Sequence, residues 1–163
     1  MKKILLILLT IQLASSGYAF DYDSYKLRDL DEVINEAKAY DPEKTEGQSL
    51  LIPPHRIHLY ERLVRYPFEC DCRPIVVLLA MALSRTAAEM PSINTCMQIE
   101  SKTGQKIGVF VQDSIAQYVE KEYALGQGIH LWSLWLFVNS SDKLPYFIIN
   151  AIGPAKQADA TDR

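Results

Sequence analysis

The spacing of apolar residues changes along the chain, from helical steps in the first half to short runs in the second. After Ser24, an apolar residue recurs every three or four positions as far as Ala37, which predicts a helix. Serine is a residue type that often caps the start of a helix. The ring of Pro42 disfavours helical geometry at the residue before it, so this helix is expected to end near Asp41. Its apolar stripe consists of Leu27, Leu30, Ile34 and Ala37.

Two further helices are predicted between residues 53 and 90. Pro53 and Pro54 open the first of them, which runs to about Tyr66 and is stopped by Pro67. Its inner stripe would be Ile57, Tyr60, Leu63 and Val64, and its wet face His58, Glu61, Arg62 and Arg65. The second runs from Pro74 to about Glu89 and is apolar on every side between residues 75 and 83. A helix without a polar face is typical of the centre of a fold.

The second half of the chain predicts strands. Residues 92–100 and 106–112 flank one polar turn, and residues 129–139 and 145–152 flank another, so each pair is expected to form a hairpin. A short helix is predicted between the hairpins, from Asp113 to about Gly126. Apolar residues occupy nearly every position from Trp132 to Val138, which is typical of a strand covered on both faces.

These elements predict an α+β fold in which N-terminal helices pack on a four-stranded, mostly antiparallel sheet, in the order ααα-ββ-α-ββ. Residues 20–152 are expected to form a single globular domain, followed by a flexible tail at residues 153–163. A small curled barrel of the kind that binds oligomers is the alternative topology. It needs five strands, and the pattern predicts four.

The N-terminus has the three-part layout of a bacterial export signal. Two lysines at positions 2 and 3 precede an apolar run at residues 4–13, and small residues stand at Gly17 and Ala19. This layout predicts a signal peptide at residues 1–19, cleaved before Phe20, and a periplasmic or secreted protein. An uncleaved N-terminal anchor is the competing interpretation, but the apolar run is short for a membrane span.

Charge and hydropathy narrow the range of partners. The whole chain has a net charge of −3, and removal of the two lysines with the signal peptide leaves −5. This mild acidity argues against nucleic acid as a partner. No further apolar run is long enough for a transmembrane segment in the mature chain.

Three cysteines are the most informative chemical feature. Cys70 and Cys72 stand one residue apart, and Cys96 follows 24 residues after Cys72. A 16-residue helix of roughly 24 Å and an extended return of roughly 20 Å would bring Cys96 back beside the other two. In an oxidising compartment this predicts a disulfide, Cys72–Cys96 on proximity or else Cys70–Cys96. The remaining cysteine would be an inert buried thiol, form a bond to another molecule, or belong to a redox-active Cys-x-Cys pair.

A metal site is the alternative use of these thiols. His55 and His58 lie three residues apart on the predicted helix, and Cys70 and Cys72 follow. Two imidazoles and two thiolates would suit zinc or copper. Against this interpretation, Cys-x-Cys is tighter than the usual ligand spacing, and His58 falls on the wet face. The sequence therefore favours no cofactor, with copper or zinc as the alternative.

No catalytic motif accompanies the cysteines. The chain has no Gly-x-Ser-x-Gly, phosphate loop or His-Glu-x-x-His, and the nearest candidate for a thiol–imidazole pair is Cys96 with His130. If one face of the last hairpin is uncovered, Trp135 and Phe137 would form an exposed aromatic patch for a partner. The sequence therefore predicts a non-catalytic binding or accessory protein, such as an inhibitor, an immunity-type neutraliser or an envelope subunit. Its partner would be another protein, and an enzyme without a recognisable motif is the remaining alternative.

Overall fold

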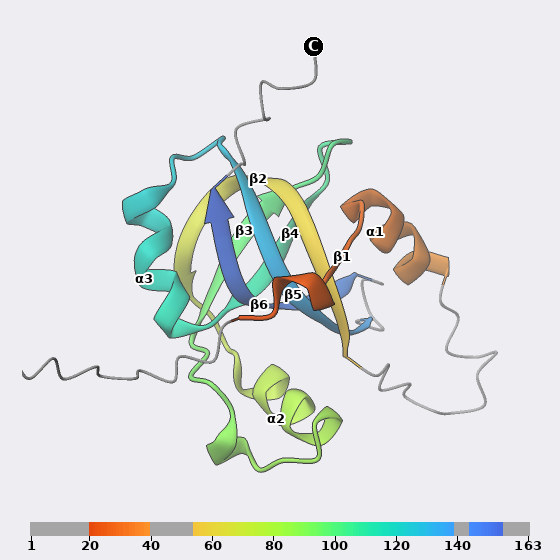
Figure 1. The fold of residues 1–163 in the computed structure, drawn as a ribbon, viewed down its shortest axis with the longest axis vertical. Coiled ribbons are helices and arrows are strands. Elements are labelled where there is room, and N and C mark those ends of the chain that lie inside the picture. The colour runs from red at the N-terminus through yellow and green to blue at the C-terminus, as the bar shows by residue number, and fades with distance from the viewer. Residues whose placement is uncertain (1–19, 40–53, 139–143, 155–163) are drawn as a thin grey trace, which may run out of the picture.

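A computed structural model describes residues 20–39, 54–138 and 144–154, and most of them build a closed β-barrel with helices around it (Figure 1). The barrel strands are β2 (His55–Glu69), β3 (Thr95–Glu100), β4 (Lys106–Val111), β5 (Gly128–Val138) and β6 (Pro145–Pro154). They are hydrogen-bonded in the order β2-β3-β4-β6-β5, and β5 pairs again with β2. The predicted four-stranded sheet with helices packed on it is therefore wrong, because a fifth strand closes the sheet on itself.

That fifth strand is β2, which occupies the segment predicted as the second helix. Its side chains alternate with period two, as in a strand that has one buried face. The buried positions are Ile57, Leu59, Glu61 and Leu63, and the outward ones include His58, Tyr60 and Arg62. The alternation is hidden in the sequence because a charged residue, Glu61, stands on the buried face. With Glu61 assigned to solvent, the helical interpretation used Tyr60 and Val64 for its inner stripe, and neither of them is buried.

β2 closes the barrel because it is long enough to pair with two other barrel strands. Its first half runs antiparallel to β5, from His55 opposite Trp135 to Arg62 opposite Gly128. Its second half runs antiparallel to β3 and ends with Glu69 opposite Thr95. Two register shifts interrupt this second half, and such bulges bend a strand and increase its twist.

The strand order is a Greek key. β2, β3 and β4 are consecutive antiparallel neighbours, and β5 returns to lie beside β2 on its other side. β6 then fills the gap, antiparallel to β5 and parallel to β4 through Phe110 and Val111. Five-stranded Greek-key barrels include the OB-folds, which bind oligonucleotides or oligosaccharides. Strand order alone carries no function, so the function has to be argued from a site.

All three α-helices contact the barrel wall, and α1 and α3 contribute to the main core. A short 3₁₀ turn (η1, Tyr22–Ser24) and the two-residue strand β1 (Lys26–Leu27) precede α1 (Leu30–Ala39). The first helix therefore starts later than predicted, because Lys26 and Leu27 pair with β2 instead. α3 (Asp113–Glu122) lies between β4 and β5 in the chain, where a helix is predicted, and buries Val119.

The helix α2 (Arg73–Ala82) and the 3₁₀ turn η2 (Ala87–Glu89) project from one end of the barrel, below it in Figure 1. α2 packs Ile75 and Leu79 against a small cluster that includes Ile93, Leu136 and Ile148 on the outside of the wall. The helix predicted for the centre of the fold is therefore peripheral. The exposed fractions of Val77, Met81 and Leu83 are 51%, 59% and 40%.

The main core fills the barrel and the space beneath α1 and α3. Its fully buried members include Leu30, Leu59, Leu63, Met97, Ile99, Ile129, Leu131 and Phe147. Within the described ranges, no helix combines the length and the apolar character that a membrane span requires. The predicted signal peptide lies outside the described residues. β6 continues through Pro154, and the rest of the predicted tail also lies outside them.

Candidate cysteine site and adjoining pocket

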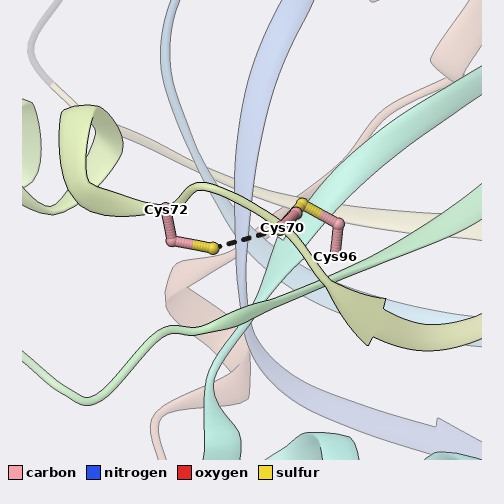
Figure 2. Close-up of side chains that lie close together, drawn as sticks. All are labelled: Cys70, Cys72 and Cys96. Carbon is pink, nitrogen blue, oxygen red and sulfur yellow. Dashed lines mark hydrogen bonds between the residues drawn. A yellow bond between two sulfur atoms is a disulfide. The ribbon is translucent and has the colours of Figure 1, made fainter.

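The three cysteines meet where β2 passes into α2. β2 ends at Glu69 and α2 begins at Arg73, so Cys70 and Cys72 lie in the three-residue connection between them. Cys96 reaches the same place from β3, where it pairs with Phe68 of β2. The structure joins Cys70 to Cys96, with their Cα atoms 5.9 Å apart, and Cys72 stays a thiol (Figure 2). Of the two pairings left open by the sequence, this is the second.

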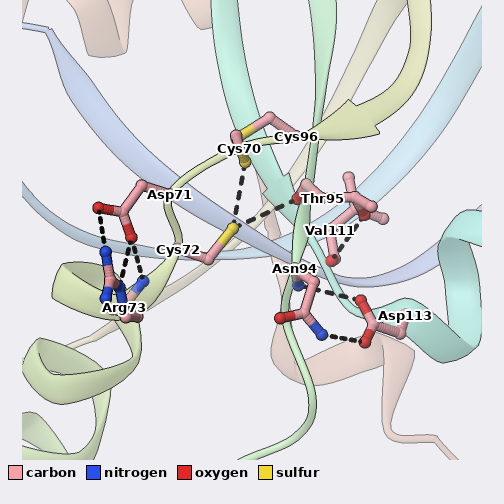
Figure 3. Close-up of a disulfide and its surroundings, with 9 residues drawn as sticks. All are labelled: Cys70, Asp71, Cys72, Arg73, Asn94, Thr95, Cys96, Val111 and Asp113. Atoms are coloured by element: carbon pink, nitrogen blue, oxygen red, sulfur yellow. Dashed lines mark hydrogen bonds and ion pairs between the residues drawn. A yellow bond between two sulfur atoms is a disulfide. The ribbon is translucent and has the colours of Figure 1, made fainter.

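The Cys72 thiol lies directly against the disulfide. Its Sγ atom is 3.1 Å from Sγ of Cys70 and 3.9 Å from the carbonyl oxygen of Thr95 (Figure 3). Because Cys70 is already bonded to Cys96, only Cys72 has a hydrogen to donate. All three sulfur atoms lie within 4.8 Å of one another. The arrangement is therefore a thiol in contact with a disulfide rather than three separate groups.

The surroundings of Cys72 keep it protonated at neutral pH. Burial raises the pKa of the thiol above its ordinary value, and the negative charges of Asp113 and Asp71 raise it further. The Arg73 guanidinium lies 3.1 Å from Asp71 and lowers the pKa of that carboxyl group. Cys72 lies at the N-cap of α2, just before its first turn.

Asp113 is held in place by groups on the segment before β3. Its carboxylate accepts a hydrogen bond from the Ser92 hydroxyl at 2.6 Å. It accepts another from the backbone N–H of Asn94 at 3.0 Å (Figure 3). These bonds lower the pKa of Asp113, so it carries its charge at neutral pH. The negative charge near Cys72 is therefore a fixed part of the fold.

An open pocket of about 630 Å³ adjoins the cysteines, between α2 and the segment that leads into β3. Cys70 and Cys72 contribute to its lining, but Cys96 does not. The apolar lining residues are Val76, Val77, Ala87, Met90, Pro91 and Ile93, and the polar ones are Asp71, Arg73, Ser92 and Asn94. The pocket thus combines an apolar wall with charged groups and the sulfur atoms.

The metal site considered from the sequence is not assembled. His55 and His58 lie on the half of β2 that pairs with β5, whereas Cys70 follows the other end of this strand. Twelve residues separate His58 from Cys70, on the order of 40 Å of extended chain. In the described part of the chain, the group of three potential metal ligands that converges is the cysteine triad. With two of the three sulfurs bonded to each other, Cys72 is the one thiol of that triad.

The other candidates fall elsewhere. Cys96 and His130 lie on β3 and β5, which are separated by β2 in the barrel. Trp135 is 7% exposed and belongs to the interior core, so it does not form a surface patch. Its indole Nε1 has no hydrogen-bond partner in the described structure. The side chain of Phe137 lies outside the described residues.

An aromatic surface occurs on the outer face of β2 and β5 instead. Trp132 stacks on His58 with ring centroids 4.6 Å apart, and Nε2 of His58 lies 2.7 Å from Nδ1 of His130. Tyr60 packs on His130, and Tyr22 meets Trp132 edge-on. The signal for this surface is the period-two spacing of Trp132 and His130, which places both on the face opposite Leu131.

Glu61 is a buried acid that the helical interpretation had placed in solvent. It is 5% exposed, and the backbone N–H of Leu30 donates to its carboxyl group. Burial raises the pKa of Glu61 to about 7, and the charges of Asp29 and Asp31 act in the same direction. Lys102 opposes them and forms an ion pair with Asp29, with Nζ and Oδ2 2.6 Å apart. The start of α1 is therefore attached to the barrel by a group that titrates near neutral pH.

Comparisons with protein-family models, with curated proteins and with solved structures found no match for this chain. The surface of the described residues has three features that could bind another molecule: the pocket beside the cysteines, the apolar side of α2 and the aromatic face of β2 and β5.

Proposed function

We propose that this protein is an exported, non-catalytic binding module that docks a partner protein on α2 and in the adjoining pocket. The export part of the proposal is supported by the signal-like layout of residues 1–19 and by the disulfide, which is typical of oxidising compartments. An inhibitor, an immunity-type neutraliser and an envelope subunit all work by docking of this kind.

The observation that carries the proposal is the solvent-facing side of α2. A surface helix normally presents polar residues to water, but the segment from Pro74 to Leu83 has no charged residue. α2 buries Ile75 and Leu79, yet Val77 and Met81 are more than half exposed on its other side. Exposed apolar patches of this sort mark sites where another molecule binds.

The pocket extends this apolar surface and gives it shape. Val77 belongs both to the exposed side of α2 and to the pocket lining, so the two features are continuous. An apolar pocket with a charged rim resembles the centre of a protein interface, where one anchoring side chain is buried and the rim excludes water. Here Asp71 and Arg73 provide the charges. We expect the partner to insert an apolar side chain into the pocket.

The disulfide makes this surface suitable for binding. It joins the start of the α2 segment to β3, so the pocket is attached to the barrel by a covalent bond. A preformed site loses less conformational entropy when the partner binds. By contrast, the aromatic rings on the outer face of β2 and β5 already pack on one another. For that reason α2 is the better candidate for the docking surface.

Site-specific photocrosslinking in the native compartment tests the proposal. A photoreactive residue at position 77 is expected to give a discrete adduct with one partner, and the same residue at position 125 is expected to give none. Leu125 is a matched control because it is 52% exposed, like Val77, but lies after α3. Met81→Glu should abolish the adduct at position 77. Equal adducts at both positions, or an adduct that consists of two copies of this chain, would contradict a heterologous docking site.

A further inference from the structure

The geometry points to an internal thiol–disulfide exchange site, in which Cys72 displaces Cys96 from Cys70. The inference does not depend on the docking proposal, because it concerns only the three cysteines. Its starting observation is the contact of 3.1 Å between Sγ of Cys72 and Sγ of Cys70 (Figure 2). A thiolate exchanges by attack on one sulfur of a disulfide, so the nucleophile is already beside its target.

The reaction needs no outside oxidant or reductant. Cys72 loses its proton to solvent, and its thiolate attacks Sγ of Cys70. The Cys72–Cys70 bond forms while the Cys70–Cys96 bond breaks, and Cys96 leaves as a thiolate that takes up a proton. One disulfide and one thiol are present before and after, so atoms and electrons balance.

The product is compatible with the chain. Cys70 and Cys72 are two residues apart, so their Cα atoms are at most about 7 Å apart. Disulfides usually join Cα atoms separated by roughly 4.4–6.8 Å, so the new bond requires only a local adjustment of the backbone at Asp71. Asp71 is exposed, and its side chain bonds to Arg73 rather than to the barrel. The side chain of Asp71 therefore does not hold this connection to the barrel.

The exchange would change how α2 is attached. In the present state, the disulfide closes a loop between positions 26 residues apart and joins the end of β2 to β3. In the exchanged state, that loop opens, and the covalent bond lies within the connection itself. The backbone pairing of Phe68 with Cys96 would remain. The site therefore has two covalent states that differ in how firmly α2 is held to the barrel.

The burial of Cys72 and the charges around it decide how fast the exchange occurs. The charged groups are Asp71 and Arg73 beside it in the chain and Asp113 at the start of α3. Burial and the two aspartates raise the pKa of Cys72, so the thiolate is scarce at neutral pH and the exchange is slow there. This explains how a thiol can remain next to a disulfide without scrambling it. It also predicts a steep dependence on pH.

Alkylation and peptide mapping test the inference on the full chain purified in its oxidised, folded state. The protein is incubated with iodoacetamide between pH 6 and 10, and mass spectrometry identifies which cysteine is alkylated. We expect Cys72 to carry most of the label at pH 7, and the rate of Cys96 labelling to rise roughly tenfold per pH unit below the pKa of the thiol. The rate should not depend on protein concentration.

Two variants make the test specific. Cys72→Ser should abolish labelling of Cys96 at every pH. Asp71→Asn removes one of the charges that disfavour the thiolate, and it should speed up Cys96 labelling at pH 8 by about two- to threefold. Asp23→Asn is the matched control, because it makes the same change at an exposed site in η1 and should have no effect.

Three outcomes would overturn the inference. Label confined to Cys72 at all pH values would mean that this thiol does not attack the disulfide. Label on Cys70 would mean that Cys96 is the sulfur attacked. A rate that rises with protein concentration would mean that exchange takes place between molecules.

Discussion

The interior of the barrel and the α2 region both contain long apolar runs, yet only the barrel buries them completely. Leu59, Leu131 and Phe147 have no exposed surface inside a wall whose strands are hydrogen-bonded on both sides. α2 covers only one of its faces and leaves Val77 and Met81 in solvent. Sheet closure therefore stabilises the first region, whereas a disulfide and a small cluster stabilise the second.

This difference matters for function. Closure pairs the barrel strands with one another, and the aromatic rings on the outer face of β2 and β5 pack on one another, so the barrel serves as a rigid support. The α2 region has exposed apolar side chains, a pocket and a thiol beside a disulfide. The features that could bind or react are thus concentrated in the part of the molecule with the smaller core.

The largest effect on stability is expected from the barrel interior. Phe147→Ala removes a ring that is fully buried in the main core, and it should lower the free energy of unfolding by about 3–5 kcal/mol. Urea denaturation measures this change. Met81→Ala is the control from α2, where the side chain is 59% exposed, and it should change stability by less than about 0.5 kcal/mol. Equal effects would contradict the contrast between the two regions.

The next largest effect is expected from the disulfide. Replacing both Cys70 and Cys96 with serine opens a loop between positions 26 residues apart, which should cost about 3.5 kcal/mol by chain entropy. Hydrogen exchange under native conditions should show the loss of protection in α2 first, because few other contacts hold it. Cys72→Ser, which keeps the bond, should preserve that protection. Equal loss of protection in the barrel strands and in α2 would show that the disulfide stabilises both regions alike.

A third effect concerns the buried acid of the barrel. The pKa of Glu61 is about 7 in the folded protein and near 4.5 as the ordinary value. Between these two pH values the folded protein retains a proton that the unfolded chain has lost, so stability falls as the pH rises through this window. The fall attributable to Glu61 should reach about 3 kcal/mol above pH 7.

Glu61→Gln tests this prediction, because glutamine can still accept the Leu30 N–H but does not ionise. The variant should lose the slope between pH 4.5 and 7 and be more stable than the wild type at pH 8. Glu32→Gln makes the same charge change on the exposed side of α1 and serves as the control. A slope that persists in Glu61→Gln would show that another group causes it.

The same residue explains the main error in predicting the fold. Both C-terminal hairpins and the helix between them could be predicted, because their apolar runs are continuous and flanked by turns. β2 could not, since Glu61 interrupts its buried face and Tyr60 stands on its outer face. Sequence patterns assume that charged residues lie in solvent. A buried carboxyl group with a raised pKa breaks that assumption, and here it concealed the strand that closes the barrel.

The candidate site was predictable only in part. The lengths of the predicted elements bring Cys96 back toward Cys70 and Cys72, and the structure places the three sulfur atoms within 4.8 Å. Which pair is bonded depends on the register of β3 against β2, and two bulges in β2 shift that register. Bulges have no reliable signature in a single sequence. The exposed position of α2 could not be predicted either. The sequence of an apolar helix does not show whether the rest of the chain or a partner covers it.

The smallest expected effect compares two ways of covering the outside of the barrel. On the β2–β5 face, which α2 does not cover, the Trp132 ring lies over Gly153. A Cβ added at that glycine would be 2.8 Å from the ring. Gly153→Ala should therefore displace Trp132 from its stack on His58, at a cost of about 1–2 kcal/mol. Urea denaturation and the near-UV circular dichroism of the tryptophans measure both consequences. Gly108→Ala on β4 is the matched control, because a Cβ there meets nothing within 4 Å. If both variants behave alike, the ring stack does not contribute to the barrel, and the β2–β5 face becomes as plausible a docking surface as α2.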